Sequence, residues 1–473
     1  MREFIKSFLS FGLASTVERL IAFVLLPIYT HYFTTAEFGA IDLVQVVIGV
    51  VSIFAHLQLE TSLQRYYYEY EGKQKHIFIS TIIAAITLLS LIITVFLIIF
   101  AQEVSMLIFK NANYSGVIKL ASLQLVFINY SMLALVVLRY EKKNIRFASM
   151  ILLKVFLTVL FILVFVVWLK KGIFGVFYAQ LIGLIISSVV LFFSVRKFSN
   201  HSFSGDFLRK SAVYALPQFP ARIGSILLTY ANRFFMVGYL TIASVGIYSL
   251  SLRLASVLQL VYTAFVMAWA PFMFEQLKNP GHKKVFAQVL LLLAGPVYLV
   301  VALLSLFSKE MVGIIASKQF YNAYHYLGGL ALYNSLMIFK EIVDIGPKFT
   351  EKTKYLSFTF FLSVAVNLLS LYFFIKFYGL YGVVYSMVLT NVVLLGISWI
   401  VSNKLYYIPY NAYKFILQSL PAFILAIGSM YILPSLGVRA AIAVFTVFFY
   451  SFTFFKYLNA FKEAHAARLQ GND

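Results

Sequence analysis

The feature that most constrains this chain is a series of apolar runs, each about 20 residues long, separated by short polar loops. A helical run of that length matches the hydrocarbon core of a bilayer, which is roughly 30 Å thick. The composition agrees, because 62% of the residues are hydrophobic and only 12% are charged, against roughly a quarter in soluble proteins. We therefore predict an all-α integral membrane protein with about 14 transmembrane helices. The predicted spans are 8–30, 40–64, 77–101, 118–138, 147–169, 173–195, 213–239, 246–272, 285–307, 322–346, 355–375, 380–402, 414–433 and 438–457.

The distribution of lysine and arginine predicts the orientation. With the N-terminus in the cytoplasm, the loops on that side carry about three times as many basic residues as the loops on the other side. Both termini are therefore expected to be cytoplasmic. The net charge of +21 is interpreted as this topology signal, because no loop is long enough to form a nucleic-acid-binding domain. The chain has no cysteine, no metal-ligand spacing of histidines and no phosphate-binding loop, so no metal site or cofactor is predicted.

Two short motifs recur at one spacing of 207 residues. "TTAEFGAIDL" at 34–43 corresponds to "TIASVGIYSL" at 241–250, and "GIFGVFY" at 172–178 corresponds to "GLYGVVY" at 379–385. Two parallel six-helix repeats around a central cavity are a transporter architecture, and we predict it here. The predicted lobes are residues 1–200 and 201–404, and residues 405–473 add helices 13 and 14 and a cytoplasmic tail.

The repeated motifs also carry a resemblance to a known group of proteins. "FxLLPIYTHYFTTAEFGAIDL" at 23–43, "YANRFFMVGYLTIASVGIYSLSLRL" at 230–254 and the segment 353–391 resemble polysaccharide-exporting flippases. These belong to the multidrug/oligosaccharidyl-lipid/polysaccharide exporter superfamily, and the resemblance covers nearly the whole chain. Family members usually have an aspartate before the arginine of span 7, where this chain has Asn232. The last two spans are similar to those of peptidoglycan-precursor flippases.

Arginines inside the predicted spans are the candidate binding residues. An arginine at mid-membrane costs at least about 2.5–3.5 kcal/mol, so it faces a wet cavity or a partner. The resemblance implies that spans 1, 2, 7 and 8 face the central cavity, and the planar guanidinium suits phosphate. We therefore predict that a lipid diphosphate contacts Arg19, Arg65, Arg222, Arg233 and Arg253.

The spacing of two of these arginines predicts a cationic ladder. Arg222 and Arg233 are 11 residues apart, which places them within about 20° of one helix face and roughly 16 Å apart along the axis. The alternative is that the embedded arginines pair with carboxylates and hold helices together, and that Arg65 reaches the interface from a span end. The carboxylates available for such pairs are Glu18, Asp42, Glu60, Glu341 and Asp344.

A second cluster lies in "KEIVDIGPK" at 340–348. Lys340 and Asp344 are spaced i,i+4, which is typical of a local helix ion pair. Glu341 and Asp344 are spaced i,i+3 and could instead hold a coupling cation or proton. Both interpretations are kept.

These observations favour a transporter without enzymatic activity or catalytic residues. The first hypothesis is a flippase that exports an undecaprenyl-diphosphate-linked oligosaccharide by alternating access, for cell-surface polysaccharide such as the O-antigen of lipopolysaccharide. It would act in a bacterial inner membrane as a monomer, with membrane lipids and polysaccharide-assembly proteins as partners and Na⁺ or H⁺ as the coupling ion. The alternatives are a peptidoglycan-precursor flippase, a drug/cation antiporter, and an enzyme such as a polysaccharide polymerase or ligase. An enzyme of that kind would need carboxylates or histidines grouped in an extracytoplasmic loop.

Overall fold

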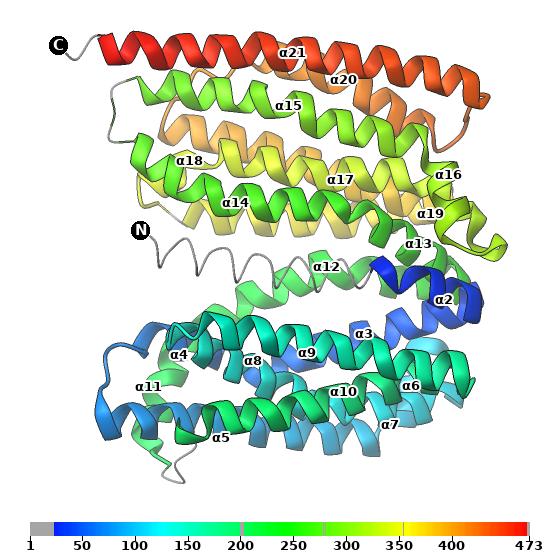
Figure 1. The fold of residues 1–473 in the computed structure, drawn as a ribbon, viewed down its shortest axis with the longest axis vertical. Helices are drawn as coiled ribbons and strands as arrows, with labels where there is room; N and C mark the ends of the chain where they lie inside the picture. The colour runs from blue at the N-terminus through cyan, green and yellow to red at the C-terminus, as the bar shows by residue number, and fades with distance from the viewer. Residues whose placement is uncertain (1–22, 199–202, 278, 280, 353, 471–473) are drawn as a thin grey trace. The chain divides into compact units, whose positions relative to one another are not determined.

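Helices account for all regular structure in the part of the chain that the computed structural model describes, residues 23–198, 203–277, 279, 281–352 and 354–470 (Figure 1). The chain forms two compact units. One comprises the residues up to Val237 together with Thr241–Gly246, and the other comprises Gly238–Leu240 and the residues from Ile247 onward. The predicted lobe boundaries at 200 and 404 describe a duplication and stay a prediction.

The first unit is a bundle in which α10 packs along α8 and α9, while α5 packs against α3 and α8 (Figure 1). Its helices are α2 (Leu26–Tyr32), α3 (Thr35–His56), α4 (Leu59–Tyr66), α5 (Gly72–Ile99), α6 (Ala101–Phe109), α7 (Ser115–Ser122), α8 (Gln124–Tyr140), α9 (Asn144–Ile162), α10 (Gly172–Val195), α11 (Gly205–Ala215) and α12 (Phe219–Tyr239).

The second unit is organised around α15, which packs against α17, α20 and α21. Its helices are α13 (Ile242–Ala255), of which the first turn belongs to the first unit, α14 (Val257–Gln276), α15 (His282–Leu306), α16 (Ser308–Ile315), α17 (Tyr324–Val343), α18 (Ile345–Phe349), α19 (Lys354–Leu405), α20 (Ala412–Gly428) and α21 (Leu436–Gln470).

The predicted fold class is confirmed. Among the described residues, 9 helical stretches are long and apolar enough to cross a bilayer, and α13 and α20 are shorter apolar helices. Each predicted span after the first coincides with a helix or with two consecutive helices. The first span lies mostly within residues 1–22, outside the described residues. The protein is thus a multi-pass membrane protein.

Two predicted spans are interrupted in the structure. Span 40–64 breaks after α3 because Leu57 and Gln58 adopt left-handed backbone angles, with φ of 46° and 60°. Span 246–272 divides into α13 and α14 at Ser256, whose hydroxyl donates to the carbonyl of Arg253 over 2.6 Å. A serine bonded to a backbone carbonyl in this way competes with the helical hydrogen-bond ladder.

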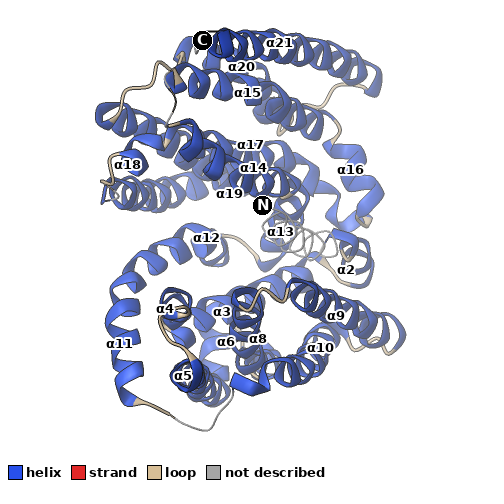
Figure 2. Cartoon of the chain, turned by 60° about the vertical axis from the view of Figure 1, so that its left-hand side comes forward, coloured by secondary structure: helices blue, strands red, loops and turns tan. Residues whose placement is uncertain are grey.

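The segment predicted as a loop at 196–212 contains helix α11 (Figure 2). The hydroxyl of Ser204 caps its N-terminus by accepting from the amide of Phe207 over 3.4 Å. Span 7 then begins at Phe219 rather than at 213, because Pro217 lies in a short 3₁₀ turn (Leu216–Gln218) and has no N–H to donate to a helix.

The second repeated motif has the same conformation in both copies. The first glycine of each copy adopts a left-handed backbone, with φ of 58° at Gly172 and 56° at Gly379. Side chains rarely adopt this conformation, and glycine does so freely. At Gly379 the helix α19 folds back on itself, since Ser370 then hydrogen-bonds Ser386 over 2.7 Å. The motif therefore encodes a tight turn between consecutive spans.

The third position after each turn requires a glycine for another reason. A Cβ on Gly175 would lie 2.9 Å from the carbonyl oxygen of Phe165, and a Cβ on Gly382 would overlap the carbonyl oxygen of Phe374. In each copy this glycine lets a new helix pack against the end of the helix before it. The two copies of the motif thus share a backbone geometry as well as part of their amino-acid sequence.

The glycines of the first motif lie against each other inside the first unit. A Cβ on Gly39 would overlap the carbonyl oxygen of Ile242 and lie 2.8 Å from the amide nitrogen of Gly246. A Cβ on Gly246 would overlap the carbonyl oxygen of Thr35. Thr35 and Ile242 are separated by the same 207 residues as Gly39 and Gly246. The contact therefore joins corresponding positions of the two copies of the motif.

We expect Gly39→Ala to destabilise the protein, because the new methyl group would meet backbone atoms that cannot rotate away. Overpacking of this kind costs typically about 1–3 kcal/mol. The measurement is the melting temperature of the purified protein in detergent. The control is Gly396→Ala in α19, where a Cβ would meet open space, so this variant should melt at or slightly above the wild-type temperature. Equal melting of both variants would contradict the close contact.

Candidate functional site

One of the predicted arginines is an internal ion-pair partner. The Arg233 side chain is 10% exposed, and its Nε lies 3.3 Å from Oδ2 of Asp42 on α3. Its Nη1 also donates to the carbonyl oxygen of Thr229 over 2.8 Å. Asn232, at the position where the resembled flippases have an acid, is buried. The acidic partner of this arginine is thus supplied across the helix interface.

Another predicted arginine lies at a cavity. A cavity of about 360 Å³ in the first unit is lined by residues of α3, α8, α10 and α12, and Arg222 is one of them. The Arg222 side chain is exposed and makes no hydrogen bond or ion pair with any described residue. Arg222 and Arg233 both lie on α12, and Arg233 is neutralised by a carboxylate whereas Arg222 has no such partner in the described part of the chain.

Uncharged polar side chains form much of the rest of the lining. Part of this lining is held in place, since Gln124 donates to the carbonyl of Phe177 over 3.1 Å and Ser52 donates to Oδ1 of Asn129 over 2.6 Å. Gln180 and Tyr230 also line the cavity and have no hydrogen-bond partner among the described residues. The cavity therefore combines a fixed polar wall with groups that are available to a ligand.

The remaining predicted arginines are placed differently. Arg65 lies on α4, where its Nη1 is 2.6 Å from Oε1 of Glu69 and its side chain is 53% exposed. Arg253 is partly buried on α13 and belongs to the second unit. Arg19 lies outside the described residues. Arg222 and Arg233 lie on the same helix, α12, and meet different surroundings, a cavity for Arg222 and the Asp42 carboxylate for Arg233.

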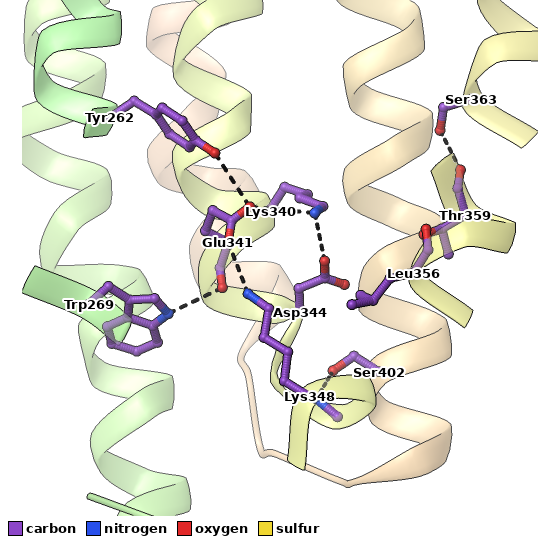
Figure 3. Close-up of polar contacts among 11 residues, drawn as sticks. Tyr262, Trp269, Lys340, Glu341, Asp344, Lys348, Leu356, Thr359, Ser363 and Ser402 are labelled. Atoms are coloured by element: carbon purple, nitrogen blue, oxygen red, sulfur yellow. Dashed lines mark hydrogen bonds and ion pairs between the residues drawn. The ribbon is translucent and has the colours of Figure 1, made fainter. Parts of the chain in front are cut away.

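The cluster around Lys340 is a compact network in the second unit (Figure 3). Lys340 Nζ lies 2.7 Å from Oδ2 of Asp344 and 3.5 Å from Oε1 of Glu341. Lys348 Nζ lies 2.9 Å from the other oxygen of Glu341. Two cations and two carboxylates thus balance one another where α17 ends and α18 begins.

A neighbouring helix and a loop hold this network in position. Trp269 of α14 donates to the carbonyl of Glu341 over 3.2 Å, and Tyr410 donates to the carbonyl of Ile342 over 2.7 Å. Asp344 is only 1% exposed, and its Oδ1 has no hydrogen-bond partner among the described residues. Such an oxygen could accept a proton or a small cation, and the ion pair with Lys340 could equally serve to anchor the two helices.

The acids of the predicted extracytoplasmic loops are not grouped into a catalytic site. Glu37 forms a capping box with Thr34 at the start of α3. Glu310 accepts a bidentate pair of 2.6 Å hydrogen bonds from Arg439 of α21. The guanidinium of Arg439 lowers the pKa of Glu310, which makes this residue a poor general acid. Within the described ranges, no group of three or more His, Asp or Glu residues could hold a metal ion.

Reasoning from the sequence found the arginines and missed the uncharged lining. Gln45, Gln124, Gln180 and Tyr230 stand inside apolar runs, and their polarity was the available signal. That signal is weak because a single amide in a membrane helix often hydrogen-bonds a neighbouring helix. Their convergence on Arg222 follows from how α3, α8, α10 and α12 pack.

Comparisons with known proteins agree with a transporter fold. Residues 4–277 match the model of a family described as polysaccharide biosynthesis protein. No curated protein sequence matches this chain. The fold is similar to that of the lipid II flippase MurJ in an inward closed conformation, with a TM-score of 0.71 and 15% identity over 95% of this chain and 99% of that chain.

Two further solved structures show the same fold. An inward-facing multidrug resistance MATE family transporter of the MOP superfamily has a TM-score of 0.61 and 15% identity, over 84% of this chain and 97% of that chain. A MOP superfamily transporter from Pyrococcus furiosus, whose binding pocket is described as having reverse polarity, has a TM-score of 0.54 and 14% identity, over 85% and 95% of the two chains. At these identities the similarity concerns the fold.

We expect Arg233→Ala to lower the stability of the protein, because it leaves the carboxylate of Asp42 buried without its cation. Removing one partner of a buried pair costs about 3–5 kcal/mol. The double variant Asp42→Leu/Arg233→Met removes both charges and should recover most of the loss. Melting temperatures in detergent would measure both effects. A stable Arg233→Ala protein that fails to export glycan would instead show that Arg233 acts on the substrate.

Proposed function

The chain belongs to the polysaccharide biosynthesis protein family, and from this premise we propose that it is a flippase for an undecaprenyl-diphosphate-linked oligosaccharide. It would move this substrate from the cytoplasmic to the periplasmic leaflet of a bacterial inner membrane by alternating access, for synthesis of a cell-surface polysaccharide such as O-antigen. The multi-pass helical fold and its similarity to flippases and transporters support this proposal.

The observation that carries the proposal is Arg222 at the cavity, which has no hydrogen-bond or ion-pair partner among the described residues. A guanidinium group within a membrane-spanning helix is costly unless it is solvated or bound to an anion. Its planar arrangement of donors matches a phosphate group in a bidentate manner. We assign Arg222 to the diphosphate, while the sugars occupy the cavity and the lipid tail stays in the bilayer.

The other predicted arginines have graded roles in this proposal. Arg233 is already neutralised by Asp42, so it would act in gating or release rather than in the first capture of the anion. Arg19, Arg65 and Arg253 are proposed to contact the diphosphate at other stages of the cycle. The membrane potential would assist export of the anionic substrate, since moving one charge through 100 mV is worth about 2.3 kcal/mol.

The network around Lys340 supports a proposed role in ion coupling. Protonation of the buried carboxylate of Asp344 would leave the Lys340 ammonium without its nearest partner and would favour rearrangement of the ends of α17 and α18. A coupling Na⁺ at Asp344 would have a similar effect by competing with the ammonium.

The alternatives differ in the charge that they require. A peptidoglycan-precursor flippase would use the same recognition of a diphosphate, so the sugar distinguishes it from the first proposal. A drug/cation antiporter would need an acidic cavity, and the lining here contains Arg222 and no acidic residue among those described. A polymerase or ligase is disfavoured because Glu37 and Glu310 have structural partners.

We expect Arg222→Ala to abolish translocation of lipid-linked oligosaccharide, and Arg222→Lys to retain part of it, because lysine keeps the charge but loses the bidentate fork. The measurement is flipping by the purified protein in liposomes, together with glycan export in cells at equal protein level. Arg209→Ala, which removes an exposed arginine from α11 outside this cavity, is the matched control. Normal export by Arg222→Ala would overturn the proposal.

We expect both termini to be cytoplasmic, because the basic residues follow the positive-inside pattern. Reporter fusions at Lys171 and Lys309 should report an extracytoplasmic location, and fusions at Lys143 and Lys283 a cytoplasmic one. A reversed pair at either repeat would contradict the proposed orientation.

A further inference from the structure

The cavity beside Arg222 has the composition of a saccharide site. Four helices contribute uncharged hydrogen-bonding side chains to it, and the described lining contains no acidic residue. We propose that this cavity is a subsite for the uncharged sugar residue attached to the diphosphate, a sugar rich in hydroxyl or acetamido groups. The inference rests on the proposed flippase function and specifies which part of the substrate this unit recognises. Its polar lining residues, besides His56, are Gln45, Ser52, Gln124, Gln180, Arg222 and Tyr230.

The free polar groups suit hydroxyl and amide ligands. An amide side chain offers both donors and an acceptor, and a phenolic hydroxyl offers one donor together with acceptor capacity. Gln180 and Tyr230 carry such groups at the cavity and make no hydrogen bond with any described residue. Sugar hydroxyls also donate and accept, so each can be matched without placing a charge in the cavity.

The fixed groups orient the wall against which the sugar would lie. The side-chain amide of Asn129 accepts a hydrogen bond from Ser52 and donates one to Ser90 over 2.8 Å. These two hydrogen bonds connect α3, α8 and α5. Gly49 of α3 leaves room for the ring of Tyr230, since a Cβ there would lie 3.2 Å from the tyrosine hydroxyl oxygen. The position of Tyr230 beside the cavity therefore depends on the absence of a side chain at residue 49.

Size and apolar surface agree with this assignment. A volume of about 360 Å³ lies within the roughly 300–1,000 Å³ typical of small-molecule sites. Ile48, Ile128 and Phe177 add apolar surface to the lining, which suits the C–H faces of a sugar ring. Sites of this kind place a few polar groups on a mostly apolar wall.

The charges that face the cavity exclude other classes of group. Arg222 would repel an amino sugar that carries a free ammonium. A second anionic group would compete with the diphosphate for this one guanidinium. His56 also lines the cavity, and its Nδ1 lies 2.8 Å from Oε2 of Glu60, so a protonated ring would have its charge balanced. An uncharged sugar beside a diphosphate fits these constraints best.

Two soluble probes separate the sugar from the diphosphate in a binding experiment. Farnesyl diphosphate carries the anion alone, and N-acetylglucosaminyl-diphosphofarnesol adds one uncharged sugar. Calorimetric titration of the full-length protein in detergent should show tighter binding of the second probe. Gln180→Ala and Tyr230→Phe should each lower the affinity for the sugar-bearing probe roughly 2- to 10-fold, the range expected for one neutral hydrogen bond. Their affinity for farnesyl diphosphate should stay unchanged.

The remaining variants make the result specific. Arg222→Ala should lower the affinity for both probes, whereas Gln74→Ala, at an exposed position of α5, should change the affinity for neither. Unchanged affinity for farnesyl diphosphate also shows that a variant is folded. If the sugar adds no affinity, or if the extra affinity that it adds persists in both Gln180→Ala and Tyr230→Phe, the result would contradict the saccharide subsite and leave the flippase proposal standing. If neither probe binds and Arg222→Ala changes nothing, both proposals fail.

Discussion

The cost of a charge or an unpaired polar group in the bilayer determines how this structure is organised. Helices satisfy the backbone internally, but each embedded arginine, lysine or carboxylate still needs water or a partner. Most of the described embedded charges meet this demand with a partner on another helix or one turn away. Arg233 is neutralised by Asp42 and Lys340 by Asp344, and at the start of the last predicted span Arg439 is likewise paired with Glu310. Arg222 has no carboxylate partner among the described residues, and for this reason we propose it as the binding group.

These ion pairs also connect segments that the loops leave apart. Arg439 joins α21 to α16 through Glu310, and it also donates to the carbonyl of Leu306 over 2.8 Å at the end of α15. The last helix, which lies beyond the predicted repeats, is thereby attached to the rest of the second unit. The donors of this guanidinium meet three acceptor groups: the Glu310 carboxylate and the carbonyls of Leu306 and Pro434. An arginine whose donors are already used in this way has a structural role and offers little to a ligand.

The fold could be predicted largely from the sequence because the length and apolar composition of membrane helices make them recognisable. The recurring motif was also visible in the sequence, and the structure gives a reason for its glycines, since Gly172 and Gly379 turn the chain while Gly175 and Gly382 permit close packing. Helix ends were less predictable. The break at Leu57 and Gln58 lies inside a continuous run of helix-compatible residues, and the start of α12 depends on Pro217 and on the preceding 3₁₀ turn.

The candidate site was predicted in part, and the reason lies in how helices meet. Helical periodicity places Arg222 and Arg233 on one face of α12, and it cannot say what stands opposite each of them. In the structure, α3 supplies Asp42 to Arg233 and part of the polar lining of the cavity beside Arg222. A site that combines one available guanidinium with uncharged donors and acceptors can bind an anionic, sugar-bearing ligand. A second unpaired guanidinium would strengthen the hold on a diphosphate and slow its release, and a transporter has to release what it binds. In the proposed flippase, the neutralisation of Arg233 would favour turnover, because it would leave capture of the substrate to Arg222 and discrimination to neutral hydrogen bonds that form and break readily.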